Sequence, residues 1–436
     1  MKGNIFTLSG VLFLTFSLIQ VAHPQEEANE HRRFIMKKGI SITVGVENAT
    51  LIGADHRALQ AAVDYVAGLG GGTVYIGPGV YEMKDSLHLR SNITVVGAGK
   101  DTILRKGSGH TSRLLTDGDY GEEQITVEDT SGFEVGMGVT VQDDHSGGFH
   151  TTVGTIIAQV DENTFTINSP LQADCMVQNN AVAKNTFPII SAYYAENIRV
   201  EHLTIDGNKA DNEYLNGCRG AGIFFYRVNR SQIMDCTVHD YNGDGFSFQQ
   251  SNDITLENCV SHHNASLGFH PGSGSQRPTM RNNLAYENGD DGLFLCWRVR
   301  HGLFEGNELR HNGRYGISIG HKDSDNILRN NRVVGNANHG VYFRNEPEYT
   351  GGHRNRLEGN RIYNNGTNGK GSGIYIDGET NDTVIVGNVI GNAPEAGPPT
   401  QRFGVVIGAK AKGVRLEGNQ IEGNLEGEMQ KIDDQP

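Results

Sequence analysis

Residues 292–319 read GLFLCWRVRHGLFEGNELRHNGRYGISI, and this stretch holds one full turn of a repeat that decides the fold. Each repeat opens with glycine followed by an apolar, a variable and an apolar residue. Copies of this pattern begin at Gly222, Gly245, Gly268, Gly292, Gly316, Gly340, Gly373 and Gly404. The successive steps are 23, 23, 24, 24, 24, 33 and 31 residues. A short structural unit therefore recurs along the chain, with longer loops in the last copies.

Asparagine marks two further positions of the same repeat. The first column contains Cys236, Cys259, Asn283, Asn307, Asn331, Asn360, Asn388 and Asn419. The second column contains Asn264, Asn288, Asn312, Asn336, Asn365 and Asn424. Asparagine tolerates left-handed backbone geometry and suits sharp bends between strands. Stacked at about 4.8 Å, its amides can also bond to the coils above and below.

Short alternating strands, separated by glycine and asparagine bends, predict an all-β parallel β-helix with two or three strands per coil. The period is too short for a β-propeller, and the leucine pattern of leucine-rich repeats is missing. Residues one and three places after each glycine should point inward, and the residue between them should face solvent. The predicted core includes Phe246, Phe248, Leu293, Leu295, Ile317 and Ile319.

Composition limits the class of protein. The 436 residues carry 37 basic and 51 acidic side chains, a net charge of −14, and 58 glycines. The charged fraction of 20% is too low for a disordered polyelectrolyte. A nucleic-acid binder would show a basic domain, so we expect no nucleic-acid partner. Glycine without a three-residue period excludes collagen.

The ends and the interruptions of the repeat predict six segments. Lys2 and the apolar run up to Ala22 predict a signal peptide over 1–22, hence a secreted or periplasmic protein that leaves the membrane once the signal is removed. An N-terminal segment should follow over 23–49. A helix capped by Asp55 and extending to Leu69 should cover the open end of the first coils within 50–106. An inserted small β module is expected over 107–187, the main β-helix over 188–425 and a polar tail over 426–436.

Three motifs resemble those of the pectate-lyase-like superfamily of right-handed parallel β-helices. They are Gly71-Gly-Thr-Val-Tyr-Ile-Gly-Pro-Gly-Val-Tyr, Asn92-Ile-Thr-Val-Val-Gly-Ala-Gly and Leu203-Thr-Ile-Asp-Gly-Asn. The resemblance is greatest to the catalytic modules of mannuronan C5-epimerases. It implies a right-handed, single-stranded parallel β-helix that acts on polysaccharide.

The catalytic motif of those epimerases, Tyr-Gly-Phe-Asp-Pro-His-Glu, is not preserved. The corresponding coil reads Asp244-Gly-Phe-Ser-Phe-Gln-Gln, and the next coil offers only His270 in the aspartate position. A second, partial likeness is to polygalacturonase-type glycoside hydrolases, through Gly289-Asp-Asp-Gly and Gly316-Ile-Ser-Ile-Gly. Those hydrolases have a histidine where this chain has Tyr315.

Charge points to an anionic ligand at the middle coils. Between Cys296 and Arg332, seven basic residues face four acidic ones, and 7 − 4 leaves +3. This reversal within an acidic chain suggests binding of a uronate polysaccharide. Solvated turn charges are the alternative interpretation. The expected substrate-binding residues are Arg298, Lys322, Arg344, Trp297 and Tyr342.

Two kinds of chemistry remain open. A lyase or epimerase would use Arg298 or Arg344 to neutralise the carboxylate, His270 or His321 to remove the C5 proton, and Tyr315 to donate a proton. An inverting hydrolase would use two carboxyl groups about 6.5 to 9.5 Å apart. Asp244 with Asp290 or Asp291 could supply them. A third alternative is a solenoid that binds carbohydrate without catalysis. We expect the protein to be a monomer. We expect no cofactor or metal, although Ca²⁺ could bind at acidic turns.

Overall fold

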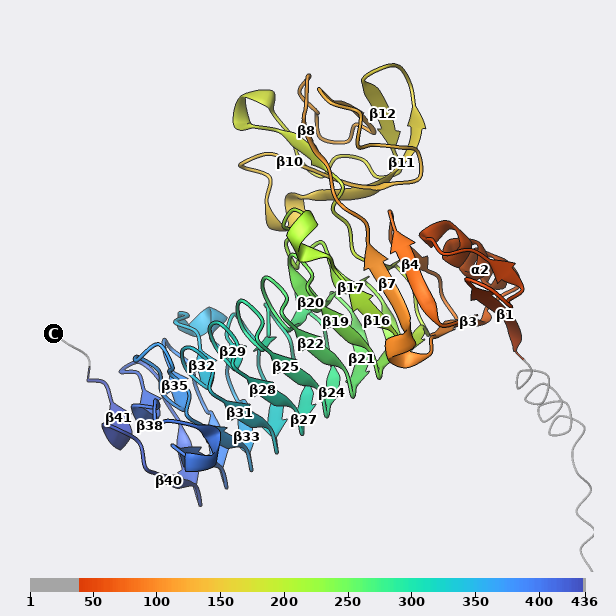
Figure 1. Cartoon of the computed structure of the whole chain (residues 1–436). Helices are drawn as coiled ribbons and strands as arrows, with labels where there is room; N and C mark the ends of the chain where they lie inside the picture. The colour runs from red at the N-terminus through yellow and green to blue at the C-terminus, as the bar shows by residue number, and fades with distance from the viewer. Residues whose placement is uncertain (1–38, 434–436) are drawn as a thin grey trace, which may run out of the picture. The chain divides into compact units, whose positions relative to one another are not determined.

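The protein is described by a computed structural model over residues 39–433. Three long parallel sheets wind around a common axis and form a β-helix (Figure 1). Each main coil contributes one strand to each sheet. A typical coil consists of β20 (Asp244–Gln249) in sheet C, β21 (Asn252–Glu257) in sheet A and β22 (Val260–His262) in sheet B. The predicted all-β parallel β-helix is confirmed.

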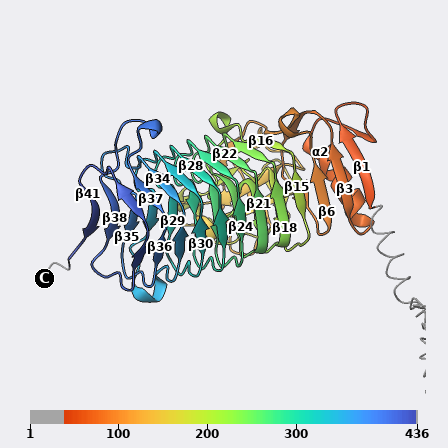
Figure 2. The same ribbon diagram turned by 90° about the horizontal axis from the view of Figure 1, so that it is seen from below.

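The strands of the three sheets follow one another along the axis, and Figure 2 shows those of sheets A and B lying side by side. Sheet A contains β2 (Leu51–Ile52), β1 (Ile40–Gly45), β3 (Gly72–Ile76), β6 (Ile93–Val96), β15 (Arg199–Glu201), β18 (Asn229–Met234), β21, β24 (Thr279–Arg281), β27 (Leu303–Glu305), β30 (Ile327–Arg329), β33 (Arg356–Glu358), β36 (Val384–Val386) and β39 (Arg415–Glu417). Sheet B contains β4 (Gly79–Met83), β7 (Thr102–Lys106), β16 (Thr204–Asp206), β19 (Thr237–His239), β22, β25 (Leu284–Tyr286), β28 (Glu308–Arg310), β31 (Arg332–Val334), β34 (Arg361–Tyr363), β37 (Val389–Gly391) and β40 (Gln420–Glu422). Sheet C contains β5 (Leu87–Leu89), β14 (Ile190–Tyr193), β17 (Ala221–Tyr226), β20, β23 (Phe269–Gly272), β26 (Leu293–Phe294), β29 (Ile317–Ile319), β32 (Val341–Phe343), β35 (Ile374–Ile376), β38 (Phe403–Ile407) and β41 (Gly427–Lys431).

The core lies inside the coils, where the glycine pattern predicts it. All six predicted core side chains are at most 2% exposed. Phe246 and Phe269 stack across neighbouring coils, with ring centroids 5.2 Å apart. A Cβ on Gly245 would come within 2.1 Å of the Ser261 hydroxyl oxygen, so only glycine fits at the start of this strand. The glycine of each repeat thus lets neighbouring coils close around the core.

The asparagine columns form continuous ladders. Asn307 Nδ2 donates to Oδ1 of Asn331 at 3.0 Å, and Asn331 Nδ2 donates to Asn360 at 2.9 Å. In the second column, Asn288 Nδ2 donates to Oδ1 of Asn312 at 3.0 Å. These amides are buried. The predicted bonding between coils is confirmed.

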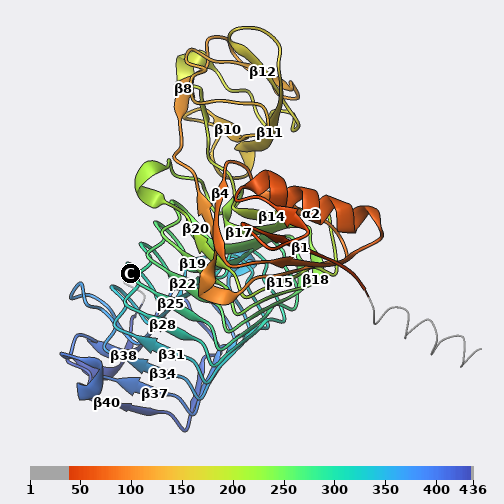
Figure 3. The same ribbon diagram turned by 45° about the vertical axis from the view of Figure 1, so that its right-hand side comes forward.

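The predicted cap helix is present as α2 (His56–Gly68), with Asp55 as its N-cap. The Asp55 carboxylate accepts the backbone N–H groups of Arg57 and Ala58. Gln60 donates to the carbonyl of His88 at 3.1 Å and accepts its N–H at 2.8 Å. The helix therefore satisfies polar groups of β5, the first strand of sheet C, at the open end of the solenoid (Figure 3).

Six antiparallel strands form a separate sheet that projects from the N-terminal coils (Figure 1). They are β8 (Thr111–Arg113), β9 (Gln124–Thr126), β10 (Gly138–Gln142), β11 (Thr152–Gln159), β12 (Thr164–Ile167) and β13 (Val182–Lys184). This inserted module has its own apolar core around Val139, Ile156 and Phe165. The solenoid continues across it, because Val95 of β6 pairs directly with Val200 of β15.

Two expectations about the ends have different outcomes. The predicted signal peptide over 1–22 lies outside the described residues. Residues 427–431, expected within a polar tail, instead form β41, which pairs with β38. Pairing through backbone groups does not require apolar side chains at this last coil. No helix among residues 39–433 has the length and apolar character needed to cross a membrane.

Candidate functional site

The outer face of sheet C carries one column of side chains that runs from β5 to β35. Strand register places its members one above the other: His88, Ser191, Phe224, Ser247, His270, Phe294, Ser318, Tyr342 and Tyr375. These are the positions between the two inward residues of each strand, and they point away from the core. The predicted stacking of Ser247, His270, Phe294, Ser318 and Tyr342 is confirmed.

Part of this column is covered, contrary to the expectation that it faces solvent. Residues 207–220, which we name the crossing loop, pass over β20 and β23. The carbonyl of Gly217 accepts the Ser247 hydroxyl at 2.7 Å. Ser247 and His270 are only 3% and 4% exposed. A Cβ on Gly217 would lie 1.6 Å from Oδ2 of Asp244, so the loop lies directly on the strand.

Asp244 and His270 are brought together beneath the crossing loop. Nδ1 of His270 lies 2.7 Å from Oδ2 of Asp244, and both side chains are buried. Burial opposes protonation of His270, but the hydrogen bond and charge of Asp244 outweigh it and raise the pKa of the imidazole. In this geometry neither group can reach a polysaccharide.

Asp291 is fully buried and tied to Arg314. The guanidinium donates to both carboxylate oxygens, at 2.9 and 3.0 Å, and the Tyr315 N–H donates at 3.0 Å. Arg314 also pairs with Asp290 at 2.8 Å. Burial and the charge of Asp291 raise the pKa of Asp290 to about 6. This arrangement fits a structural role for Asp291, since a hydrolase needs carboxyl groups that meet water and substrate.

Tyr315 and Tyr342 stack on each other, with centroids 4.6 Å apart. His339 and Tyr375 extend the stack along the axis. The Tyr342 hydroxyl donates to Asp377 at 3.2 Å. Rings stacked in this way cover each other's faces, so mainly their edges remain for contact with a sugar.

The remaining predicted residues lie near the turn that follows sheet C. Trp297 stacks on His321 at 4.1 Å, and His321 Nδ1 lies 3.3 Å from Glu346. Arg298 is exposed, and Lys322 is half-buried on the equivalent turn of the next coil. Arg344 instead lies flat on sheet C, where it donates to Ser318 at 2.9 Å, to the Leu295 carbonyl at 2.8 Å and to Asp323 at 3.0 Å.

The local positive charge is largely paired. Four of the arginines counted in the sequence have carboxylate partners within 4 Å: Arg310, Arg314, Arg329 and Arg332. Arg344, which lies beyond that segment, is paired as well. The sequence-predicted residues thus form several separate clusters along the outer face of the coils, and most of their polar groups bond within the protein.

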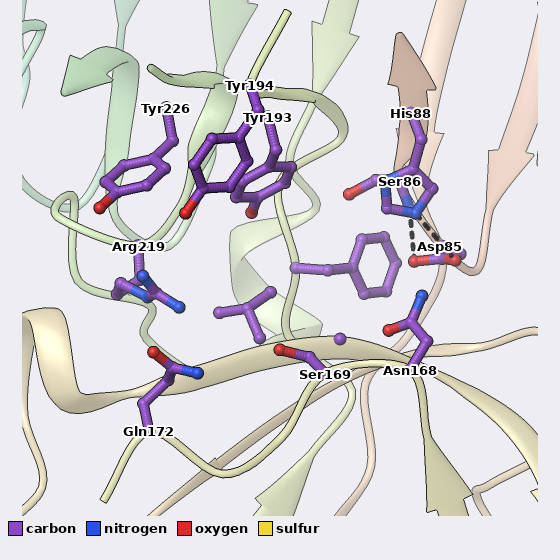
Figure 4. A pocket seen from close by; sticks show the side chains of 13 residues that line it. Asp85, Ser86, His88, Asn168, Ser169, Gln172, Tyr193, Tyr194, Arg219 and Tyr226 are labelled. Atoms are coloured by element: carbon purple, nitrogen blue, oxygen red, sulfur yellow. Dashed lines mark hydrogen bonds and ion pairs between the residues drawn. The ribbon is translucent and has the colours of Figure 1, made fainter. Parts of the chain in front are cut away.

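The first three strands of sheet C carry a different and more enclosed site. A pocket of about 310 Å³ lies between β5, β14 and β17 and the inserted module (Figure 4). This volume is at the lower end of the range for small-ligand pockets, about 300–1,000 Å³. The solenoid and its loops supply Asp85, His88, Phe187, Tyr193, Tyr194, Arg219 and Tyr226, and the module supplies Val153, Gly154, Asn168, Ser169 and Gln172.

His88 is held in a defined orientation at one side of the pocket. Its Nε2 lies 3.2 Å from the Asp85 carboxylate, and its Nδ1 lies 2.9 Å from the Ser191 hydroxyl. The Thr155 hydroxyl also donates to Asp85, at 2.7 Å. This network joins sheet C to β11 of the inserted module. The position of the module over the sheet is thereby coupled to the side chain of His88.

Tyr193 and Arg219 face the same space from opposite elements. Figure 4 shows the hydroxyls of Tyr193, Tyr194 and Tyr226 directed toward the Arg219 side of the pocket. Burial raises the pKa of Tyr193 to about 12, although the charge of Arg219 acts against this rise. Arg219 Nε donates to the Thr151 carbonyl at 2.9 Å. No carboxylate of residues 39–433 forms an ion pair with Arg219.

The pocket therefore combines a phenol, a cation and an oriented imidazole in a partly closed space. It can bind a carboxylate through Arg219 and exchange protons through Tyr193 or His88. Within the described part of the chain, no group of three or more histidine, cysteine or acidic residues is placed to hold a metal ion.

Sequence reasoning missed these residues. Strands β5 and β14 lack the glycine marker, and 103 positions separate His88 from Ser191 although their side chains touch. One signal was present in the sequence. The tyrosines at the end of Ile190-Ser-Ala-Tyr-Tyr and of Phe224-Phe-Tyr occupy the same strand position, and extending the column upstream would have aligned them.

Comparison with known proteins agrees with this architecture. The family model described as "Right handed beta helix region" matches residues 139–300, 211–350 and 295–428. Mannuronan C5-epimerases AlgE3 and AlgE2 of Azotobacter vinelandii are each 24% identical, over 66% and 72% of this chain. The chain spans only 11% and 24% of the length of those two relatives.

Solved structures show the same fold at low identity. The AlgE4 A-module of the Azotobacter vinelandii mannuronan C-5 epimerase has a TM-score of 0.58 at 17% identity, covering 90% of this chain and 98% of that one. A structure named glycoside hydrolase has a TM-score of 0.53 at 11% identity, covering 87% and 96%. The family match extends over more than half of the sequence, and the three parallel sheets agree with it: the chain belongs to the right-handed β-helix family.

Proposed function

We propose that this protein acts on a uronate-containing polysaccharide by removing the C5 proton, as a lyase or an epimerase, in the pocket beneath the inserted module. The observation that carries the proposal is that Tyr193 and Arg219 face one enclosed space beside His88. The mannuronan C5-epimerases among the relatives support a polysaccharide substrate of this class.

The chemistry needs a cation first, because a charged carboxylate makes the neighbouring C5 proton less acidic. Arg219 can supply a guanidinium that forms no ion pair with a carboxylate in the described chain. Its planar group suits paired hydrogen bonds to a carboxylate. The amides of Asn168 and Gln172 and the hydroxyl of Ser169 line the module side and can bond to sugar hydroxyls.

A base must then take the C5 proton. The Tyr193 phenolate can do so. Burial raises the pKa of Tyr193 to about 12, and the charge of Arg219 offsets only part of this rise. In a lyase, the electron pair from C5–H forms the C4=C5 double bond, the C4–O4 bond breaks, and O4 receives a proton. In an epimerase, a proton returns to C5 from the opposite face. His88 or Tyr226 is placed to be the second proton carrier.

The first test is incubation with alginate, pectate and neutral glycans. Unsaturated ends indicate a lyase, and solvent deuterium at C5 without cleavage indicates an epimerase. New reducing ends without unsaturation would instead support a hydrolase, and binding without turnover a carbohydrate-binding solenoid. Either of these results would contradict the proposal, as would the absence of activity on every uronate glycan tested.

A variant locates the activity. Tyr193→Phe should lose turnover and keep substrate binding, because only the phenol hydroxyl is removed. Tyr120→Phe is the matched control, since Tyr120 lies on the module and is 73% exposed. Full activity of Tyr193→Phe would exclude this pocket as the catalytic site.

A further inference from the structure

We infer that the pocket receives the end of a polysaccharide chain, so that the enzyme acts at chain ends and on short oligosaccharides and not within long chains. This inference rests on the proposed function and concerns which part of the polymer enters the site. It follows from the sides on which the pocket is closed.

The crossing loop closes the side toward the C-terminal coils. Besides Ser247, its Gly217 carbonyl accepts Gln249 Nε2 at 3.5 Å, and Gln249 is fully buried. Leu215, only 1% exposed, anchors the loop and its N–H donates to the Asn242 carbonyl. The outer face of sheet C is thus covered over β20 and β23. A polymer lying along the axis of the solenoid cannot pass from the pocket to Tyr342.

Three other sides are also occupied. The module forms the roof through β11 and residues 168–172. The base of the module forms the back, where Phe187 is 1% exposed and the Ser86 hydroxyl donates to the Pro188 carbonyl. On the remaining side, the Thr155 hydroxyl of β11 donates to Asp85 at 2.7 Å, and His88 of β5 lies 3.2 Å from the same carboxylate. The floor of the pocket is therefore only three strands wide, about 10 Å at the usual strand spacing.

One direction remains open, toward the turn between sheets C and A. A second hollow of about 180 Å³ adjoins the pocket there, lined by residues 88–91 and 191–195. The two hollows share His88, Tyr193 and Tyr194. Tyr194 is 69% exposed and lies at the mouth. A chain with its last sugar beside Arg219 would leave across Tyr194, and an internal sugar would need a second exit.

The test uses polymannuronate and polygalacturonate of uniform length, labelled at the reducing end. With end action by a lyase, small products of one or two sizes appear while the remaining polymer shortens only gradually. With end action by an epimerase, C5 exchange is confined to terminal residues. Products of many intermediate sizes from the start would overturn the inference and leave the proposed function intact. Absence of any turnover would overturn the proposed function itself.

Opening the loop gives a second test. Gly217→Ala is designed to displace the crossing loop from sheet C, because the new methyl group would overlap the buried Asp244 carboxylate and lie 2.8 Å from Nδ1 of His270. Arg219 lies on the same loop, so total turnover should fall as well. The residual activity should give products of intermediate size and lose the preference for ends. Gly147→Ala is the matched control, since a Cβ there meets nothing within 4 Å and the residue has a negative φ of −92°.

If Gly217→Ala does not fold, Leu215→Ser provides a second way to release the loop. Circular dichroism first establishes that each variant is folded. Unchanged end preference in a folded variant whose loop is shown by limited proteolysis to be released would refute the role of the loop.

Discussion

The asparagine ladder allows a quantitative test of what holds the coils together. Asn307 is 2% exposed and makes four side-chain hydrogen bonds. Its Nδ2 donates to the Met280 carbonyl at 3.0 Å and to Asn331 at 3.0 Å. Its Oδ1 accepts the backbone N–H of Asn283 at 3.0 Å and the Asn283 side chain at 2.9 Å. Asn307→Ala removes all four. The Asn283 backbone N–H loses its acceptor, whereas Asn331 Oδ1 keeps the Asn307 backbone N–H at 2.9 Å and Asn283 Nδ2 keeps the Leu256 carbonyl at 3.1 Å.

A net contribution of about 1 kcal/mol per bond predicts a loss of about 4 kcal/mol in the free energy of unfolding. Guanidinium chloride unfolding followed by circular dichroism measures this loss. Because a solenoid can unfold in parts, hydrogen exchange of the Asn283 amide, which loses its acceptor, should be read in parallel. This amide should exchange faster than amides of distant coils.

Asn345→Ala is the control, since Asn345 is exposed and lies outside both ladders. It should change stability by no more than about 0.5 kcal/mol, as is usual for surface positions. If Asn307→Ala costs less than about 1 kcal/mol, a value expected for a single bond, the argument that the ladder stabilises the solenoid is wrong.

Three further results are expected. Arg219→Gln should lower kcat/KM on uronate substrates by about 10- to 100-fold, because a hydrogen bond to a charged group contributes about 1.5–3 kcal/mol. Equal activity of the variant and the parent protein would contradict the role of Arg219. The pKa of His270 is raised in the folded protein, so its pair with Asp244 stabilises the fold fully below about pH 6.5, the pKa of an unperturbed histidine. This stabilisation is lost as the pH rises through the higher pKa of the folded state. The urea concentration at the unfolding midpoint should therefore fall over that pH range in the parent protein and not in Asp244→Asn. Burial lowers the pKa of Lys106 to about 7, so between about pH 7 and pH 10.4 the unfolded chain binds more protons than the folded chain. The stability of the parent protein should therefore rise with pH over this range. Lys106→Met should be more stable than the parent at pH 6, and urea unfolding at several pH values should show that this difference shrinks toward pH 10.

The fold could be predicted because the residues that determine each coil recur at regular intervals in the sequence. Glycine at Gly245 and its equivalents, and asparagine at Asn307 and its equivalents, serve the same steric and bonding purpose in every coil. Outward positions could be aligned by the same count, and Ser318 and Tyr342 do lie in register. Residues that have the same role in every coil therefore recur at a regular spacing in the sequence.

The site could not be predicted because its causes are not periodic. The sequence does not show that Arg314 pairs with the Asp291 carboxylate, which removes Asp291 from contact with a substrate. It also does not show that the crossing loop covers His270. The crossing loop has no counterpart in other coils, and Arg314 occupies a repeat position at which the two preceding coils carry Ser266 and Asp290. The pocket itself combines strands on either side of a long insertion with loops of the inserted module. Its geometry is set by long-range contacts that periodicity does not encode.

The insertion also separates the molecule into parts that should fold at different rates. Neighbouring coils of the main solenoid join residues 24 positions apart, as Asn283 and Asn307 do, whereas Asn92 and Asn197 are joined across 105 positions. Closing the longer loop costs about 1.3 kcal/mol more in chain entropy. The downstream coils can therefore zip together before the junction at the module closes, and the junction should be the first to open on heating. Because the pocket lies on that junction, activity should vanish at a lower temperature than the β signal of the solenoid.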